Sequence, residues 1–417
     1  MEAPRSVHHN RAHSVNKSNG PRLSFTRPSM VANTCISSSA WDEARLDAMN
    51  AMEATSSDER IAEPRFLKHR TPSWAERPLL KAGAKSGQGL VSLYIHYMTS
   101  IKNRSHDQKP TYTKYYPSRP TLVNHVWIPN SYTSGPDVPL LPLLIDIHGG
   151  GFMIGHPALD DRDNAIFAHR HGICVVSINY RKTPPYRFPV PVQDCAAIIQ
   201  DVLDDPDLPI DKSKVAIIGY SAGGNLALAS PQLNELHSEI RGVVAYFPVT
   251  DFVRNVHHRK SEATPPPYRG DILVRGMKHF NWIYLGRHRN HNLKNPLASP
   301  LWAERTKLPE KIFILGCEYD VLFGEARDAA ERYRELEQAE ASEKSDKSPL
   351  GDGRTGWTCG NVTWEELKGL EHGYNQRWPI EVGKRRKEWK RRTDEHHAYV
   401  AEWLWREVYA PLPRGQI

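Results

Sequence analysis

The sequence lacks the long apolar runs that a membrane protein needs. No apolar run in its 417 residues approaches the roughly 18 residues that span a bilayer, and the N-terminus lacks the apolar core of a secretory signal. We therefore expect a cytoplasmic protein without a transmembrane segment. The first 40 residues hold a single acid, Glu2, among Arg, Lys, Ser and His residues. A mitochondrial presequence is therefore the alternative for this segment.

The sequence is also poor in cysteine. Its 5 cysteines are an odd number and show neither CxxC nor zinc-ligand spacing. Three of them fall inside apolar segments, so we expect reduced core residues and no metal site. The cysteines are Cys35, Cys174, Cys195, Cys317 and Cys359.

Positive charge exceeds negative charge, but no long tract concentrates it. The formal net charge is +7, and the densest basic block is residues 384–392, at the start of a predicted C-terminal helix. This block is either an exposed helix face or a patch for nuclear import or anion binding. Because no nucleic-acid recognition motif accompanies it, we expect no nucleic-acid partner.

Composition divides the chain into segments of different character. The 32 prolines and a mean hydropathy of −0.59 predict a large loop content. The predicted segments are a disordered arm (1–38), an N-terminal cap region (39–118), an α/β core (119–251 and 301–413), a second cap element (252–300) and, inside the core, a flexible polar insertion (339–360).

Short apolar segments alternate with helical segments from about residue 120 onward. The apolar segments have the length and composition of buried strands, and this βαβ rhythm predicts an α/β fold with a mostly parallel central sheet, helices on both faces and a helical cap. The expected strands are 143–147, 173–178, 215–218, 243–247, 311–315 and 362–367; the expected helices include 192–203, 225–229 and 324–337.

One serine lies at the junction of an expected strand and helix. The apolar run from Val215 ends in Gly219-Tyr220-Ser221-Ala222-Gly223. Glycines two residues before and two after a serine permit a sharp turn that exposes its hydroxyl, and the following helix points its positive end at that position. The segment therefore predicts a nucleophilic serine.

Three more elements of an acyl-transfer site stand after other expected strands. His148-Gly149-Gly150-Gly151 follows the strand 143–147, and its glycines let backbone N–H groups approach a substrate oxygen closely. Asp320 follows the strand 311–315, where it is either a helix N-cap or the acid of a triad. His372 follows the last expected strand and has the exposed-loop context of a general base. The chain order Ser221, Asp320, His372 is that of the α/β-hydrolases.

Six motifs together resemble the hormone-sensitive-lipase family of α/β-hydrolases, the GDXG type of esterase and lipase. The resemblance covers roughly residues 120–410. The motifs are His148-Gly-Gly-Gly-Phe152, Asn179-Tyr-Arg181 with Phe188-Pro189, Gly219-Tyr-Ser-Ala-Gly-Gly-Asn225, Ser299-Pro-Leu301, Asp320-Val-Leu322 and His372-Gly373.

The resemblance implies a capped pocket, carboxylic-ester hydrolysis of a small-molecule ester through an acyl-enzyme, and neither metal nor organic cofactor. Ser221 would be the nucleophile, His372 the general base and acid, and Asp320 the group that orients His372. The N–H groups of Gly150, Gly151 and Ala222 would form the oxyanion hole. His148 would orient the loop, and Gly149, Gly219 and Gly223 would support the two turns.

Two residues depart from the family pattern. Tyr220 replaces the usual Asp before the nucleophile, and Asn179 replaces the usual Asp of the Asp-Tyr-Arg segment. Tyr220 either lines the pocket or packs. Pro-rich, weakly patterned cap segments favour a small or medium acyl group.

Two other functions stay open on the same scaffold. The triad attacks any activated carbonyl, so an amide, lactone or thioester is the alternative substrate class. A receptor-like binding module is the alternative to an enzyme, and the presence of His372 speaks against it. The residues carry no signal for oligomeric state.

Overall fold

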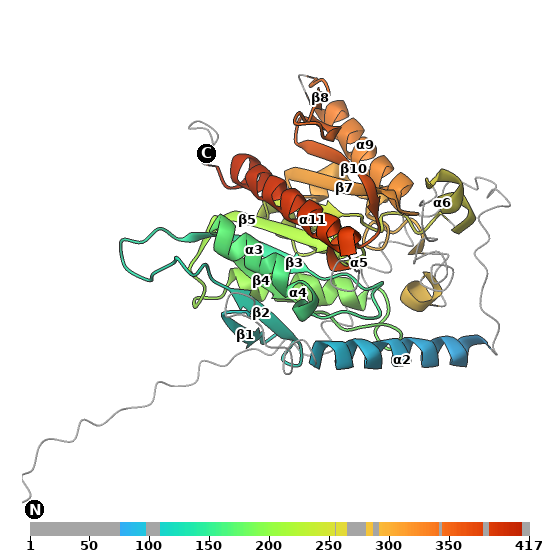
Figure 1. The fold of residues 1–417 in the computed structure, drawn as a ribbon, viewed down its shortest axis with the longest axis horizontal. Helices are drawn as coiled ribbons and strands as arrows, with labels where there is room; N and C mark the ends of the chain where they lie inside the picture. The colour runs from blue at the N-terminus through green and yellow to red at the C-terminus, as the bar shows by residue number, and fades with distance from the viewer. Residues whose placement is uncertain are drawn as a thin grey trace, which may run out of the picture. The chain divides into compact units, whose positions relative to one another are not determined.

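A ten-stranded sheet organises the described part of the chain (Figure 1). The computed structural model describes residues 76–96, 109–254, 256–264, 281–286, 292–341, 344–377 and 383–410. All of these residues belong to one unit of the chain, residues 64–417. The arm predicted over residues 1–38 lies outside the described residues.

The strands follow one another in the order β1-β2-β4-β3-β5-β6-β7-β10-β9-β8. The strands from β4 to β10 in this order pair in parallel, and the two outer strands on either side pair antiparallel. The strands are β1 (Tyr112–Tyr115), β2 (Val123–Trp127), β3 (Leu141–Ile147), β4 (Cys174–Ile178), β5 (Ile210–Tyr220), β6 (Gly242–Tyr246), β7 (Lys311–Tyr319), β8 (Ser348–Pro349), β9 (Thr355–Cys359) and β10 (Val362–Glu371).

Helices cover both faces of this sheet. Helices α3 and α11 contact each other on one face, and Figure 1 shows them crossing the sheet together. Helices α4, α5 and α9 pack against the sheet in the other core cluster. The described helices are α2 (Glu76–His96), α3 (Asp161–His171), α4 (Val190–Leu203), α5 (Ala222–Ala229), α6 (Val256–Glu262), α9 (Phe323–Glu340), α10 (Tyr374–Arg377) and α11 (Gly383–Trp403).

Alternating side chains on the strands divide the core into two layers. On β3, Leu143 and Ile145 are buried in the layer with α4, whereas Leu144 is buried in the layer with α3 and α11. A strand buried on both faces is mostly apolar along its whole length, which is why the sequence could predict these strands. Each such side chain contributes roughly 1.5–3 kcal/mol of burial free energy. The predicted mostly parallel sheet with helices on both faces is confirmed.

The polar segment over residues 339–360 differs from the flexible insertion that the sequence predicts. Helix α9 continues to Glu340, and β8 and β9 extend the sheet beyond β10. Trp357 of β9 stands opposite Trp364 of β10, so an aromatic cross-strand pair holds this edge despite its polar neighbours. Edge strands need only one apolar face. This short segment has too few apolar residues to show the alternation of apolar and polar residues that would predict a strand.

The predicted cap segments are described only in part. Within 39–118, the structure has α2 and also β1, which belongs to the sheet. Within 252–300, it has α6 and the stretches 281–286 and 292–300, and the rest lies outside the described residues. The side chain of Gln88 in α2 donates to the carbonyl oxygens of Met153 and Thr183 at 2.9 and 2.8 Å. These bonds place α2 beside the loop that follows β3.

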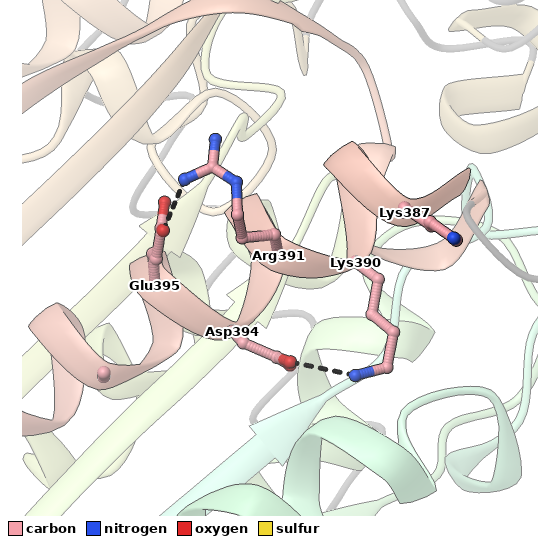
Figure 2. A pocket seen from close by; sticks show the side chains of 6 residues that line it. Lys387, Lys390, Arg391, Asp394 and Glu395 are labelled. Carbon is pink, nitrogen blue, oxygen red and sulfur yellow. Dashed lines mark hydrogen bonds and ion pairs between the residues drawn. The ribbon is translucent and has the colours of Figure 1, made fainter. Parts of the chain in front are cut away.

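The basic block 384–392 forms the start of α11, where much of its charge is paired along the helix. Lys390 lies 3.1 Å from Asp394, and Arg391 contacts Glu395 (Figure 2). Arg391 also contacts Glu388. Trp389 in the same block is buried. Pairs at these spacings are typical of a solvated helix face, the first of the two predicted alternatives.

The described cysteines, Cys174, Cys195, Cys317 and Cys359, are free and buried, and Cys35 lies outside the described residues. No helix in the described ranges has the length and apolar character needed to cross a bilayer.

A buried ion pair anchors α6 to the core. The Arg259 Nε–H donates to Glu325 Oε2 at 2.5 Å, and Glu325 Oε1 accepts from the Thr250 N–H at 2.9 Å. Both charged side chains are almost fully buried, and burial raises the pKa of Glu325 to about 7. Glu325 of α9 is thus bonded both to Thr250, in the segment that follows β6, and to Arg259 in α6.

Arg259→Ala is expected to lower the free energy of unfolding by roughly 3–5 kcal/mol, because it leaves the Glu325 carboxyl buried without its partner. Urea denaturation measures the loss. Arg327→Ala is the matched control, since its half-exposed pair with Asp328 contributes at most about 1 kcal/mol. Equal losses in the two variants would contradict an anchoring role for Arg259.

Asp146 is a buried carboxyl group in the middle of the sheet. It accepts from Ser177 Oγ at 2.5 Å and Asn164 Nδ2 at 2.9 Å, yet burial raises its pKa to about 7. The folded state therefore holds a proton that the unfolded chain releases near pH 4, so stability falls as pH rises from about 4 to about 7.

Asp146→Asn is expected to flatten this dependence, because the amide does not titrate. One proton accounts for at most about 1.4 kcal/mol per pH unit within that window. Urea denaturation of both proteins at several pH values in the window measures the slopes. Parallel slopes would show that Asp146 ionises normally in the folded protein.

Candidate functional site

Ser221 lies on a sharp turn between β5 and α5. Strand β5 ends at Tyr220, α5 begins at Ala222, and Ser221 has a positive φ of 56°. Non-glycine residues rarely adopt this region, and holding one there costs on the order of 1–3 kcal/mol. The turn predicted from the glycine spacing is thus present.

The flanking glycines are required by close backbone contacts. A Cβ on Gly219 would lie 2.2 Å from the carbonyl oxygen of Gly223, and a Cβ on Gly223 would lie 1.9 Å from that of Ile147. Only residues without a side chain fit at these two positions. The start of α5 can therefore approach the end of β3.

His372 connects Ser221 to Asp320. Its Nδ1 lies 2.7 Å from Asp320 Oδ2, and its Nε2 lies 2.9 Å from Ser221 Oγ. A carboxylate only accepts hydrogen bonds, so the Nδ1–H donates to Asp320 and the Nε2 lone pair accepts the serine O–H. The arrangement can remove the hydroxyl proton as the oxygen attacks a carbon.

The sheet topology brings these three residues together. Ser221 follows β5, Asp320 follows β7 and His372 follows β10, and the order β5-β6-β7-β10 is parallel throughout. The carboxyl ends of parallel strands lie at one edge, which is where sites on such sheets are found. Asp320 is fully buried and its Oδ1 accepts from the Leu322 N–H at 2.9 Å, so its carboxylate is held from both sides.

The loop after β3 brings unused backbone donors to the same edge. Gly150 has a φ of +117°, and a Cβ on Gly149 would lie 2.9 Å from the carbonyl oxygen of Tyr220, so this loop lies directly against the serine turn. Within the described ranges, no hydrogen bond is donated by the N–H groups of Gly150, Gly151 or Ala222. Donors of this kind can bind an oxyanion.

His148 is buried behind this loop. Its Nδ1 donates to the Gly149 carbonyl oxygen at 2.7 Å, and its ring stacks on Tyr180 at a centroid distance of 4.5 Å. Burial, with Lys182 nearby, lowers the pKa of His148 well below its ordinary value. A neutral, fixed imidazole fits the orienting position that the sequence predicts for it.

Lys182 is a residue near the site that the sequence pattern did not single out. Its Nζ donates to Asn179 Oδ1 at 2.7 Å and lies 3.7 Å from the centroid of the Tyr180 ring. Burial lowers the pKa of Lys182 to about 7. The Lys182 amino group therefore contacts the position where the family usually has a carboxylate.

Tyr220, the other departure, packs away from the triad. Its side chain is 1% exposed, with its ring against Tyr246 and Phe247 and its hydroxyl 3.5 Å from His397 Nε2 of α11. Burial raises the pKa of Tyr220 well above its usual value, so the phenol stays neutral. Packing is the alternative that the structure shows.

Aromatic side chains extend from the Gly-rich loop toward the second predicted cap segment. Phe152 stacks on Tyr284 at a centroid distance of 3.7 Å, and Phe252 lies beside both rings. All three rings are buried, so the cap segment packs apolar side chains against the Gly-rich loop. The described residues contain no cluster of three or more His, Cys, Asp or Glu side chains arranged to hold a metal ion.

Known proteins are similar to this chain in sequence and in fold. The profile of a family described by its alpha/beta hydrolase fold matches residues 144–347. An arylesterase of Saccharolobus solfataricus is 32% identical over 202 residues, which are 46% of this chain and 60% of that protein. The vegetative-specific protein H5 of Dictyostelium discoideum is 27% identical over 219 residues, 48% of this chain and 60% of that protein. The chain thus spans less than two thirds of these relatives' length.

Solved esterase structures have the same fold. A hyperthermophilic esterase of Pyrobaculum calidifontis superposes with a TM-score of 0.59 at 21% identity, over 82% of this chain and 100% of that one. A thermostable carboxylesterase from a metagenomic library superposes with a TM-score of 0.57 at 22% identity, over 77% of this chain and 97% of that one. The chain therefore has the α/β-hydrolase fold, the fold by which the family of the matching profile is described.

Proposed function

We propose that the protein is a serine hydrolase that cleaves carboxylic esters of small or medium size. The observation that carries this proposal is the position of His372, which hydrogen-bonds Asp320 at 2.7 Å and Ser221 at 2.9 Å. A binding module needs no imidazole hydrogen-bonded to a serine hydroxyl. The names of the relatives and neighbours, which include arylesterase and carboxylesterase, support the same reaction class.

The proposed mechanism has two halves. Ser221 Oγ attacks the ester carbonyl carbon while His372 Nε2 takes the hydroxyl proton, and the carbonyl electrons move to oxygen. Collapse of this intermediate breaks the bond to the alkoxy oxygen, which receives the proton from His372. Water then attacks the acyl-enzyme with His372 again as the base, which releases the acid and restores Ser221.

Asp320 and the loop donors have complementary roles in this proposal. Asp320 fixes the tautomer of His372 and stabilises the imidazolium that forms in each half-reaction. The N–H groups of Gly150, Gly151 and Ala222 receive the developing oxyanion. One such donor typically lowers the barrier by about 3 kcal/mol.

The proposal of an ester substrate is supported by the names of the relatives and not by the three site residues themselves. The same three residues would attack an amide, lactone or thioester carbonyl. The aromatic side chains of Phe152, Phe252 and Tyr284 are buried against one another beside the oxyanion loop, so they support that loop and do not select a substrate class. Matched p-nitrophenyl esters, an anilide and a thioester separate these classes.

Ser221→Ala is expected to abolish p-nitrophenyl ester hydrolysis, with a loss in kcat of at least about 10³-fold, because the acyl-enzyme needs its oxygen. Steady-state kinetics on short and medium chains measure the loss. Ser213→Ala, on the exposed start of β5, is the matched control and should keep full activity. Equal rates for wild type and Ser221→Ala would remove the serine mechanism.

Asp320→Asn is expected to lower kcat by on the order of 10⁴-fold, the loss that this change causes in a serine protease triad, because the amide favours the wrong His372 tautomer. KM should change much less than kcat. Asp352→Asn, in an exposed turn, is the control. A kcat close to that of the wild type would show that Asp320 does not orient the base.

A further inference from the structure

Two carboxamide side chains follow His372 and reach across to α3. Asn375 Nδ2 donates to Asp163 Oδ2 at 3.0 Å, and Gln376 Nε2 donates to Asp160 Oδ1 at 2.5 Å. Both donors belong to the short helix α10, and both acceptors lie where the loop that carries the oxyanion donors enters α3. The two loops that must face each other in catalysis are therefore joined by side chains.

The turn that carries His372 contains a glycine in the left-handed region. Gly373 follows His372 with a φ of +66°, and a Cβ there would meet no atom within 4 Å. The turn's own backbone bond runs from the Gln376 N–H to the Gly373 carbonyl oxygen at 3.1 Å. The imidazole is thus carried by a glycine turn whose far end is held by the two carboxamides and by buried Tyr374, whose hydroxyl group lies 2.8 Å from His396 Nδ1.

The Asn375–Asp163 bond is buried and the Gln376–Asp160 bond is partly buried, which makes their loss costly. Asp160 is 0% exposed, Asp163 is 3% exposed and Asn375 is 2% exposed. A polar group that loses its partner at such a position typically costs about 1–3 kcal/mol. The side chains therefore hold one arrangement rather than exchange with solvent.

Asp163 also lies close to His397, which in turn lies beside Tyr220. Its Oδ1 lies 3.7 Å from His397 Nδ1, and His397 Nε2 lies 3.5 Å from the hydroxyl group of Tyr220. Tyr220 precedes Ser221. Asp163 of α3 therefore contacts the turn that carries His372 directly, through Asn375, and the serine turn indirectly, through His397 and Tyr220. The tyrosine at this departure from the family pattern belongs to that chain of contacts.

Several ionisable groups surround the two acceptor carboxyl groups. Burial, with Asp146 and Asp163 nearby, raises the pKa of Asp160 well above its usual value. Asp163 faces Arg162 at 3.1 Å. Asp161, beside them, pairs with His125 at 2.7 Å.

We propose that Asn375 and Gln376 are positioning residues that hold the His372 turn against α3 and so keep the imidazole aligned between Asp320 and Ser221. The proposal rests on the proposed function, since alignment matters for proton transfer at Ser221. It adds residues outside the triad and the oxyanion hole. They act through His372 and do not touch the substrate.

The test compares wild type with Asn375→Ala, with Gln376→Ala and with the double variant Asn375→Ala/Gln376→Ala. The proposal expects kcat on a p-nitrophenyl ester, per active site titrated with a fluorophosphonate, to fall on the order of 10–100-fold with little change in KM. It also expects the downfield proton resonance of His372 Nδ1–H to shift or broaden. The NMR signal reports the position of the imidazole whether or not the protein hydrolyses the ester.

Two further variants separate positioning from general stability. Asp394→Asn removes the ion pair between Arg162 of α3 and Asp394 of α11 and should leave both kcat and the His372 resonance unchanged. The exchanged pair Asp163→Asn/Asn375→Asp restores a carboxamide–carboxylate bond and should recover most of the kcat lost in Asn375→Ala.

The outcomes are distinct. An unchanged His372 resonance and kcat in the Asn375 and Gln376 variants would overturn the proposal, as would equal effects of Asp394→Asn. If wild type showed no hydrolysis and no probe labelling, the proposed function would fail, while the resonance would still decide whether the two carboxamides position His372.

Discussion

The hydrogen bonds from Asp320 through His372 to Ser221 are the constraint on which the rest of the structure depends. Both distances, 2.7 and 2.9 Å, must hold at once although the three residues follow three different strands. Parallel pairing of β5, β6, β7 and β10 satisfies this requirement by ending every strand at one edge. The buried sheet is thus a frame that fixes the separation of three loops.

Close backbone contacts add the second part of the frame. The serine turn approaches the end of β3 so closely that Gly223 leaves no room for a Cβ beside Ile147. That contact brings the Gly-rich loop, with its free N–H groups, against the turn that presents Ser221. In the proposed mechanism the nucleophile and the oxyanion donors are therefore positioned by the same packing that holds the sheet together.

The parallel core and the three triad residues could be predicted from the sequence because both leave local patterns. Buried strands read as continuous apolar runs, and each candidate residue follows such a run, as Ser221 follows Val215–Ile218. The edge strands could not be predicted in this way. Strand β9 lies in a polar segment, and its cross-strand pair of Trp357 with Trp364 is visible only in the folded register.

The contacts behind the site were also beyond prediction, for a different reason. Asn375 and Asp163 are 212 residues apart in the chain, and neither belongs to a recognisable motif. The packing of Tyr220 against His397 depends on where α11 crosses the sheet, which no local pattern encodes. Sequence patterns therefore located the residues that we propose to react, whereas the side chains that we propose to orient them emerged only from tertiary structure.

The central claim is an acyl-enzyme on Ser221, and rapid-quench mass spectrometry with p-nitrophenyl acetate tests it most directly. Protein quenched within the first turnover should carry one acetyl group, and peptide mapping should place that group on Ser221. Release of p-nitrophenol in an amount equal to the active sites should accompany it. Turnover with no acetylated protein, or with the acetyl group on another residue, would contradict the account.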